Sequence, residues 1–264
     1  MNRSSRCTFA VVVASCDAFA DVWPVHLAMM QLNWPECHLP VYFLTNELAP
    51  ESAAVTSILV GRDKSWSDNL RTALEALSED YVLLTLDDLM LTEPVQTSIL
   101  DDVFSWIAVT RPNCLRLTTP PPPDLVIDDR FGRIEPGSLY RTGTIWSVWK
   151  REVLHDLLVP GETAWEFELE GSKRSDKYND FYSTRKSVVH VANAIVRGKW
   201  DPRVLCILSR QGVISSTVKR LVMTRSEVLR YRASIFRSHL LYLLPSRYRR
   251  RIRQFVKSVT RGSV

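Results

Sequence analysis

The sequence predicts an α/β protein in which helices cover the faces of a β-sheet. Short apolar runs alternate with longer stretches of helical period through roughly the first two hundred residues. This alternation is typical of α/β folds. A composition of 45% hydrophobic and 24% charged residues in a chain of 264 allows a sizeable core. We expect one α/β domain over residues 1–210 and a basic tail over residues 211–264.

The first predicted strand is the apolar, β-branched run Thr8–Ser15. Arg3 and Arg6 precede it, so the start of the chain superficially resembles a secretion signal. The apolar stretch Thr8–Ala14 is at the short limit for a signal core. We therefore expect an internal strand here.

Helical and extended patterns then alternate as far as residue 86. We predict helices over Asp21–Asn33 and from Trp66 onward, and strands over Val41–Leu44, Val55–Val60 and Tyr81–Leu86. Pro35 marks the end of the first helix. Ser65 and Asp68 form the S-x-x-D pattern of a capped helix start, which places the second helix just before the third of these strands.

The second half of the domain continues the alternation with longer connections. We predict helices over Val95–Val109, Arg151–Leu158 and Thr163–Glu170, strands over Leu115–Leu117, Thr144–Trp149 and Val188–Val196, and a polar loop over Lys173–Lys186. The prolines Pro120–Pro123 cannot join a hydrogen-bonded ladder. We expect the segment that they open, up to Gly137, to be a loop over the functional face.

The charge of the chain is unevenly distributed. Residues 217–264 hold 13 Lys/Arg and one acid, Glu227, so the net charge of +5 divides into +12 for this segment and 5 − 12 = −7 for the rest. Within it, Ser246–Val259 places apolar residues on one helical face and arginines around the others. This composition predicts a helix that lies on anionic lipid. A nucleic-acid backbone is the alternative partner, but the interleaved leucines from Leu240 to Leu244 favour lipid.

Two features bear on the cellular compartment. The five cysteines are few, widely spaced and without a metal-like C-x-x-C pattern, which indicates free thiols in a reducing compartment. No run reaches the roughly 18 apolar residues that cross a bilayer. We expect a cytoplasmic protein bound peripherally to the inner face of the cell membrane.

Asp87 and Asp88 are the strongest candidate site residues. They end the buried strand Tyr81–Leu86, and the carboxyl ends of strands are where open α/β sheets bind ligands. Two carboxylates at that edge can hold Mg²⁺ or Mn²⁺ against phosphate oxygens. The alternative is that the two acids cap the next turn. The functional interpretation predicts an enzyme of nucleotides or nucleotide sugars.

A second acidic cluster includes Glu166 and Glu168, which alternate with Trp165 and Phe167. Either carboxylate could act as the base for a sugar hydroxyl, with an aromatic ring as an apolar platform. The equally supported alternative is the first turn of a helix whose aromatic side chains belong to the core.

Cations near two predicted turns are candidate phosphate ligands. Lys64 precedes Trp66 at a helix start, where free N–H groups also attract anions. Arg197 and Lys199 flank a glycine after the last predicted strand. Each group could equally form a solvated helix entry or an ordinary turn.

Taken together, five blocks resemble a bacterial family of GT-A-type glycosyltransferases of surface polysaccharide and lipopolysaccharide synthesis. The blocks are Ser15-Cys16-Asp17-Ala18-Phe19 with Trp23, Lys64-Ser65-Trp66-Ser67, Leu86-Asp87-Asp88, Trp165-Glu166-Phe167-Glu168 and Gly198-Lys199-Trp200. The resemblance covers roughly residues 8–205. It implies a GT-A-like, Rossmann-like mixed sheet flanked by helices.

The resemblance also implies roles for individual residues. Asp17 and Trp66 would lie beside the nucleotide, Asp87 and Asp88 would occupy the D-x-D region, and Glu166 or Glu168 would face the acceptor. The pair departs from a full D-x-D, which puts strict metal dependence in doubt. Lys64, Arg197 or Lys199 would then carry part of the leaving-group stabilisation.

The expected reaction is transfer of a sugar from a nucleotide-sugar donor to a hydroxyl of a glycan or lipid-linked acceptor, through an oxocarbenium-like state. The sequence leaves two alternatives. One is a nucleic-acid-binding or metal-dependent phosphodiesterase-type protein that uses the basic tail. The other is a sugar-binding relative without activity.

Overall fold

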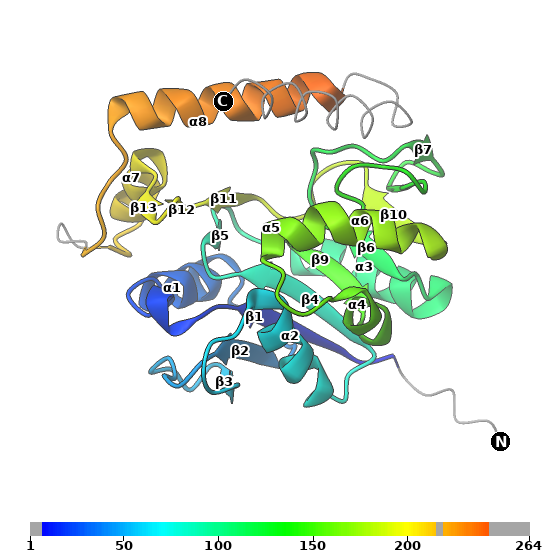
Figure 1. The fold of residues 1–264 in the computed structure, drawn as a ribbon, viewed down its shortest axis with the longest axis horizontal. Coiled ribbons are helices and arrows are strands. Elements are labelled where there is room, and N and C mark those ends of the chain that lie inside the picture. Colours follow the sequence, from blue (N-terminus) through cyan, green and yellow to red (C-terminus); the bar gives the residue numbers. More distant parts are fainter. Residues whose placement is uncertain (1–6, 215–218, 243–264) are drawn as a thin grey trace.

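The computed structural model describes residues 7–214 and 219–242, apart from the side chain of Leu241. Its centre is a nine-stranded mixed sheet with the strand order β3-β2-β1-β4-β9-β6-β10-β8-β7 (Figure 1). The predicted fold class, a mixed α/β sheet flanked by helices, is confirmed. The predicted tail helix Ser246–Val259 lies outside the described residues.

One half of the sheet is parallel. Its strands are β1 (Phe9–Ala14), β2 (Val41–Thr45), β3 (Thr56–Leu59) and β4 (Tyr81–Leu86). Strand β1 pairs with both β2 and β4, and Ala14 lies opposite Leu44 on one side and Leu86 on the other. The carboxyl ends of these strands therefore meet at one edge of the sheet.

The other half is mixed. Its strands are β9 (Ser147–Lys150), β6 (Cys114–Arg116), β10 (Phe181–Thr184), β8 (Phe131–Arg133) and β7 (Leu125–Val126). Strand β9 is antiparallel to both β4 and β6, and β10 is parallel to β6. Strands β6 and β10 therefore run in the direction of β4 and end at the same edge.

Helices cover both faces of the sheet. The two layers are α1 (Trp23–Asn33) with α3 (Thr97–Thr110), and α2 (Trp66–Glu75) with α4 (Arg151–Leu157). Successive β1 residues point to opposite faces. Val11 and Val13 belong to the core beneath α1 and α3, whereas Val12 and Ala14 belong to the core beneath α2 and α4.

The remaining elements gather near the carboxyl edge. They are β5 (Leu89–Leu91), β11 (Val191–Asn193), β12 (Ile195–Val196), β13 (Lys199–Trp200), α7 (Pro202–Arg210) and α8 (Arg225–Tyr242). Short helical turns cover Asp17–Phe19, α5 (Ala164–Glu166), Phe167–Gly171, α6 (Ser172–Arg174) and Ser175–Lys177. In Figure 1, α8 runs along the top of the molecule, beyond α7 and the β12–β13 hairpin.

Most predicted strands and helices are found within one to three residues of their expected bounds, and three predictions are wrong. The expected polar loop Lys173–Lys186 contains β10, a fully buried strand of the central sheet. The expected strand Val188–Val196 is divided into β11 and β12, which pair outside that sheet. The expected loop 120–137 contains β7 and β8. Among the described residues, no helix is long and apolar enough to cross a membrane.

Candidate active site

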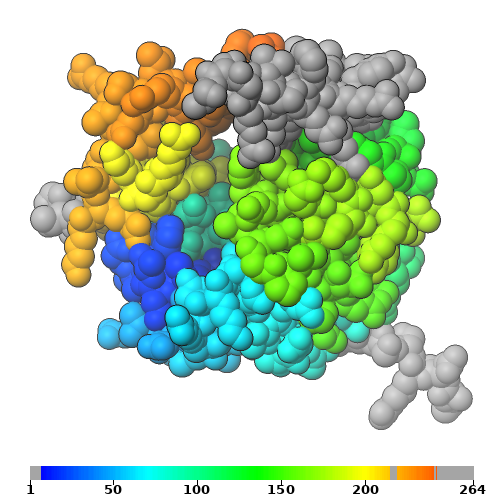
Figure 2. All heavy atoms as spheres, in the orientation of Figure 1, coloured from blue at the N-terminus to red at the C-terminus, as the bar shows by residue number. Residues whose placement is uncertain are grey.

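The two predicted acids form the connection between a central strand and a peripheral one. Asp87 and Asp88 are the two-residue turn that joins β4 to β5 at the carboxyl edge of the sheet. A cavity of about 240 Å³ lies against them. It is lined by Ala14, Ser15, Cys16, Phe19, Asp63, Trp66, Asn69, Leu86, Asp87 and Asp88. The molecular surface in Figure 2 is hollowed where the blue, green and yellow segments meet.

Asp87 is held by a short chain of hydrogen bonds. The Ser15 hydroxyl donates to the Asp87 carboxylate, and the Trp23 indole N–H donates to Ser15 Oγ at 2.6 Å. Burial raises the pKa of Asp87 to about 7, and the charge of Asp88 adds to the rise. The Ser15 hydrogen bond and the Arg220 charge oppose it. The site therefore keeps a carboxyl group that changes charge near neutral pH.

Asp88 has an oxygen that is buried but not hydrogen-bonded. Burial raises the pKa of this carboxyl to about 6. Within the described part of the chain, its Oδ1 atom has no hydrogen-bond partner. Leaving a buried carboxylate oxygen unpaired is unfavourable. A cation or a donor group supplied by a ligand would satisfy it.

The acid pair fits a divalent cation that is shared with a substrate. No group of three or more His, Cys, Asp or Glu residues with metal-binding geometry occurs among the described residues. A fully protein-built site is therefore not present there. Mg²⁺ is commonly bound by only one or two carboxylates together with water and substrate phosphates. Asp87 and Asp88, with the unpaired oxygen, match that smaller requirement.

The buried side chain of His26 contacts the Asp87–Asp88 turn, and this role was not predicted from the sequence. Its ring is buried, and Nδ1 lies 2.9 Å from the Asp87 carbonyl oxygen. Because a carbonyl only accepts, Nδ1 carries the proton and donates. Burial lowers the pKa of His26 to about 4, so the ring is neutral at physiological pH. The only sequence signal was one histidine at a helical position facing the core.

Asp17 is close to the cavity, but its carboxylate is engaged by the protein itself. It accepts hydrogen bonds from the backbone N–H groups of Asn46, Glu47 and Leu48 at 3.0–3.3 Å. The Asp17 N–H donates in return to Asn46 Oδ1. The carboxylate thus ties the loop after β1 to the loop after β2, and its neighbours Cys16 and Phe19 line the cavity.

Trp66 is one of the predicted site residues that line the cavity. It lies at the start of α2 and packs on Phe167 with a ring-centroid distance of 5.4 Å. Its Nε1 atom is buried and has no hydrogen-bond partner in the described segments. The predicted helix cap is confirmed, since Ser65 Oγ accepts the Asp68 N–H at 3.1 Å. Lys64 is exposed and does not line the cavity.

The two candidate bases have different surroundings. Glu166 closes a capping box with Thr163, whose N–H lowers the pKa of this carboxyl. Glu168 Oε1 accepts from both the N–H (3.0 Å) and the hydroxyl (2.8 Å) of Thr144. Glu168 also lies within electrostatic range of the buried Arg116 guanidinium. Of the two acids, Glu168 is thus the one held by the segment before β9, and it directly follows Phe167, whose ring contacts Trp66. Neither acid lines the cavity.

The predicted cations are not part of the cavity lining. Arg197 and Gly198 form the β12–β13 turn with φ of 51° and 76°, and Arg197 is exposed. Lys199 Nζ pairs with Glu227 of α8 at 2.7 Å. The cation whose charge acts on Asp87 is Arg220, which sequence reasoning counted only as part of the basic tail.

Arg220 packs against one wall of the cavity. Its guanidinium lies over the Phe19 ring at 4.4 Å and pairs with Asp21 at 2.7 Å. Tyr231 lies farther along, in α8. Burial raises the pKa of this phenol, and the negative charges of Asp201 and Asp88 add to the effect. The start of α8 is therefore within electrostatic range of the acid pair.

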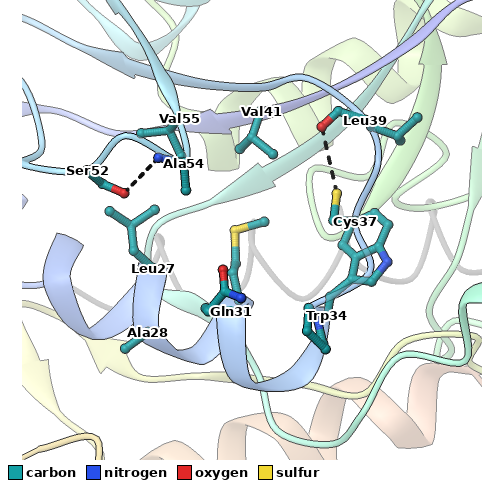
Figure 3. Close-up of a pocket in the computed structure, with 12 residues that line it drawn as sticks. Leu27, Ala28, Gln31, Trp34, Cys37, Leu39, Val41, Ser52, Ala54 and Val55 are labelled. Carbon is teal, nitrogen blue, oxygen red and sulfur yellow. Dashed lines mark hydrogen bonds between the residues drawn. The ribbon is translucent and has the colours of Figure 1, made fainter.

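Three larger cavities in the described part of the chain differ in character from this one. One of about 320 Å³ lies between α1 and the segments around β2, and its lining, which includes Leu27, Trp34 and Val41, has no charged side chain (Figure 3). Another of about 480 Å³ lies between the start of α3 and the segment after β10. The third, of about 370 Å³, is lined by residues 133–136, Arg141, Asn179 and Asp180. None of the three includes Asp87 or Asp88, so the smaller cavity is the candidate site.

Comparisons with known proteins show the fold. No protein-family model matches the chain, and no curated protein matches it. A UTP-bound UGPase from Acinetobacter baumannii has a similar structure over 87% of this chain and 99% of its own, with a TM-score of 0.51 and 8% identity. S. aureus TarS 1–349 in complex with UDP matches over 80% of this chain and 67% of that chain, with a TM-score of 0.45 and 10% identity. This chain spans only 32% of the length of a longer S. aureus TarS structure, at 12% identity and a TM-score of 0.40. The chain thus shares an α/β fold with the nucleotide-bound UGPase.

Proposed function

We propose that the protein is a nucleotide-sugar-dependent glycosyltransferase that acts in cell-surface polysaccharide synthesis. The observation that carries the proposal is the Asp87–Asp88 turn at the carboxyl edge of β4, with an unpaired buried oxygen and the Trp66 ring on one cavity. The UTP bound to the structurally similar UGPase is consistent with a nucleotide ligand at this type of fold.

In the proposed reaction, Asp87 and Asp88 would hold Mg²⁺ or Mn²⁺ at the diphosphate end of the donor site. The bound cation would neutralise charge on the departing nucleotide. Ser15 and Trp23 fix the Asp87 carboxylate, and Trp66 offers its ring to the donor. Arg220 adds positive charge next to the pair.

Glu168 is the proposed base for the acceptor hydroxyl. Its Oε1 atom accepts both the N–H and the hydroxyl of Thr144, which orients the carboxylate. The hydroxyl oxygen attacks the anomeric carbon as the bond to the nucleotide diphosphate breaks, and Glu168 accepts the hydroxyl proton. The acceptor would be a glycan or a lipid-linked sugar.

Thermal shifts with UDP, GDP, CDP and CMP, each with and without Mn²⁺, test the donor site. A ligand at 100 times its Kd stabilises a fold by about 2.7 kcal/mol. We expect one nucleotide to raise Tm in a Mn²⁺-dependent manner, and Asp88→Asn to remove the shift. Asp129→Asn, at a fully exposed acid, is the matched control. If no nucleotide shifts Tm, the donor site is wrong.

Product analysis separates sugar transfer from nucleotidyl transfer, because the first releases a nucleoside diphosphate and the second releases pyrophosphate.

We further propose that the protein works at the cytoplasmic face of the cell membrane. The +12 balance of residues 217–264 supports this location. A nucleic-acid partner is the less favoured alternative.

A further inference from the structure

Helix α8 has two different long faces. Half-buried residues recur on the face that packs against the protein, among them Glu227, Tyr231, Ser234 and Ser238. Their spacing of three or four residues is that of one helical face. This face includes Glu227, which forms the ion pair with Lys199, and the Tyr231 phenol, on which the charge of Asp88 acts. The opposite face of α8 is therefore turned away from the rest of the protein.

The opposite face exposes an apolar stripe. Leu229, Phe236 and Leu240 are 69%, 63% and 47% exposed. With Ala233 they fall within an arc of about 60° at 3.6 residues per turn. A row of large apolar side chains on one exposed helix face is characteristic of a surface that binds another protein or a membrane. We define these four residues as the outer stripe of α8.

Arginines flank the outer stripe on both sides. Arg225 and Arg232 lie on one side of the arc, and Arg230 and Arg237 lie on the other, and all four are exposed. The single acid of the helix, Glu227, is on the opposite face. Its carboxylate accepts from Lys199 Nζ and from the Thr224 N–H at 2.8 Å. The outer face of α8 is therefore apolar along its middle and purely basic along its borders.

This arrangement decides between two occupants. A second copy of the chain that docked through the same face would bring two sets of arginines together, which like-charge repulsion disfavours. A surface of anionic lipids satisfies both features, because acyl chains accept the apolar side chains and phosphate groups accept the arginines. We propose that the outer stripe of α8 docks on an anionic lipid surface.

Docking would orient the candidate active site. The segment before α8 is fixed to the β12–β13 hairpin by two backbone hydrogen bonds of 2.9 Å. The Trp200 N–H donates to the Leu221 carbonyl, and the Met223 N–H donates to the Trp200 carbonyl. The inner face of α8 is within electrostatic range of Asp88. The acid pair would therefore lie beneath the lipid-bound helix. That a lipid-linked sugar reaches it as the acceptor rests on the proposed function, whereas the docking does not.

The test is flotation of the full-length protein with vesicles of 30% phosphatidylglycerol in phosphatidylcholine, and with phosphatidylcholine vesicles alone. We expect binding to the anionic vesicles only. Leu229→Ser with Phe236→Ser should lower the partition coefficient by about tenfold or more, because apolar area leaves the bilayer. Leu32→Ser with Val109→Ser removes exposed apolar side chains from α1 and α3, and should bind like the wild type.

A second variant addresses charge without touching the stripe. Arg230→Gln with Arg237→Gln should weaken binding by about fivefold per arginine. All variants should retain wild-type circular dichroism. The inference is overturned if the stripe variant floats like the wild type, or if the wild type is a dimer that the stripe variant dissociates. The nucleotide thermal shift, measured on the same samples, reports separately on the proposed function.

Discussion

At the scale of single residues, the candidate site depends on carboxylates placed where water cannot fully solvate them. Asp87 is 5% exposed, and Ser15 provides its hydrogen bond. The neutral His26 ring behind the turn supplies a donor to the backbone but no positive charge. Both acids are therefore held at a cost in stability that a bound cation would offset.

The raised pKa values predict how stability depends on pH. Asp87 titrates near 7 in the folded protein but near 4 when unfolded, so between these values the folded state binds the extra proton. Without metal, the contribution of Asp87 to the free energy of unfolding should fall as pH rises from about 4 to about 7, by roughly 1–3 kcal/mol. Asp87→Asn should flatten that decline in thermal melts at pH 5 and pH 8.

Mn²⁺ provides the complementary measurement. Since metal binding requires ionised carboxylates, Mn²⁺ should stabilise the wild type more at pH 8 than at pH 5. Asp129→Asn should behave as the wild type in both experiments. An Asp87→Asn profile that declines as steeply as the wild-type profile would show that Asp87 is already ionised throughout this range.

At the scale of elements, the helices and strands with a clear hydrophobic periodicity could be predicted from the sequence. The strands that depend on tertiary contacts could not. The strand before Asp87 is continuous and apolar, and the helix at Trp66 has a clear cap, so both were predicted. Strand β10 has four residues between charged segments, and its burial comes from pairing with β6 and β8. No local pattern reveals such pairing.

The same limit applies to the site. The pair Asp87–Asp88 and the ring of Trp66 could be predicted because strand ends and helix starts are local features. Arg220 could not, since it is 133 residues from Asp87 and reaches the cavity wall only through its contacts with Phe19 and Asp21. Lys199 was predicted as a donor ligand, but the structure gives it a partner on α8.

Lys199 therefore allows a direct test of its role. If its main function is the ion pair with Glu227, Lys199→Gln and Glu227→Gln should each lower the free energy of unfolding, Glu227→Gln by more because its carboxylate also accepts from Thr224. The double variant should lose no more than Glu227→Gln alone. Nucleotide affinity should stay unchanged in all three. A loss of affinity in Lys199→Gln that Glu227→Gln does not share would instead assign Lys199 to the donor site.

At the scale of the whole molecule, the candidate cavity is bounded by segments that are far apart in the chain. The turn after β1, the start of α2 and the β4–β5 turn line it, and Arg220 packs against one wall. The sheet brings the first three together because parallel strands end at a common edge. Arg220 lies there because the segment before α8 returns to that edge of the sheet.

Hydrogen exchange with and without UDP and Mn²⁺ can locate the ligand on this framework. We expect slower exchange in residues 14–19, 63–70 and 86–89, because residues of these segments line the cavity. The segments 93–103 and 184–190, which line the 480 Å³ cavity, should be unchanged. Asp88→Asn should abolish the protection. Protection confined to segments 93–103 and 184–190 would move the ligand to the larger cavity and leave the Asp87–Asp88 turn as a structural connection.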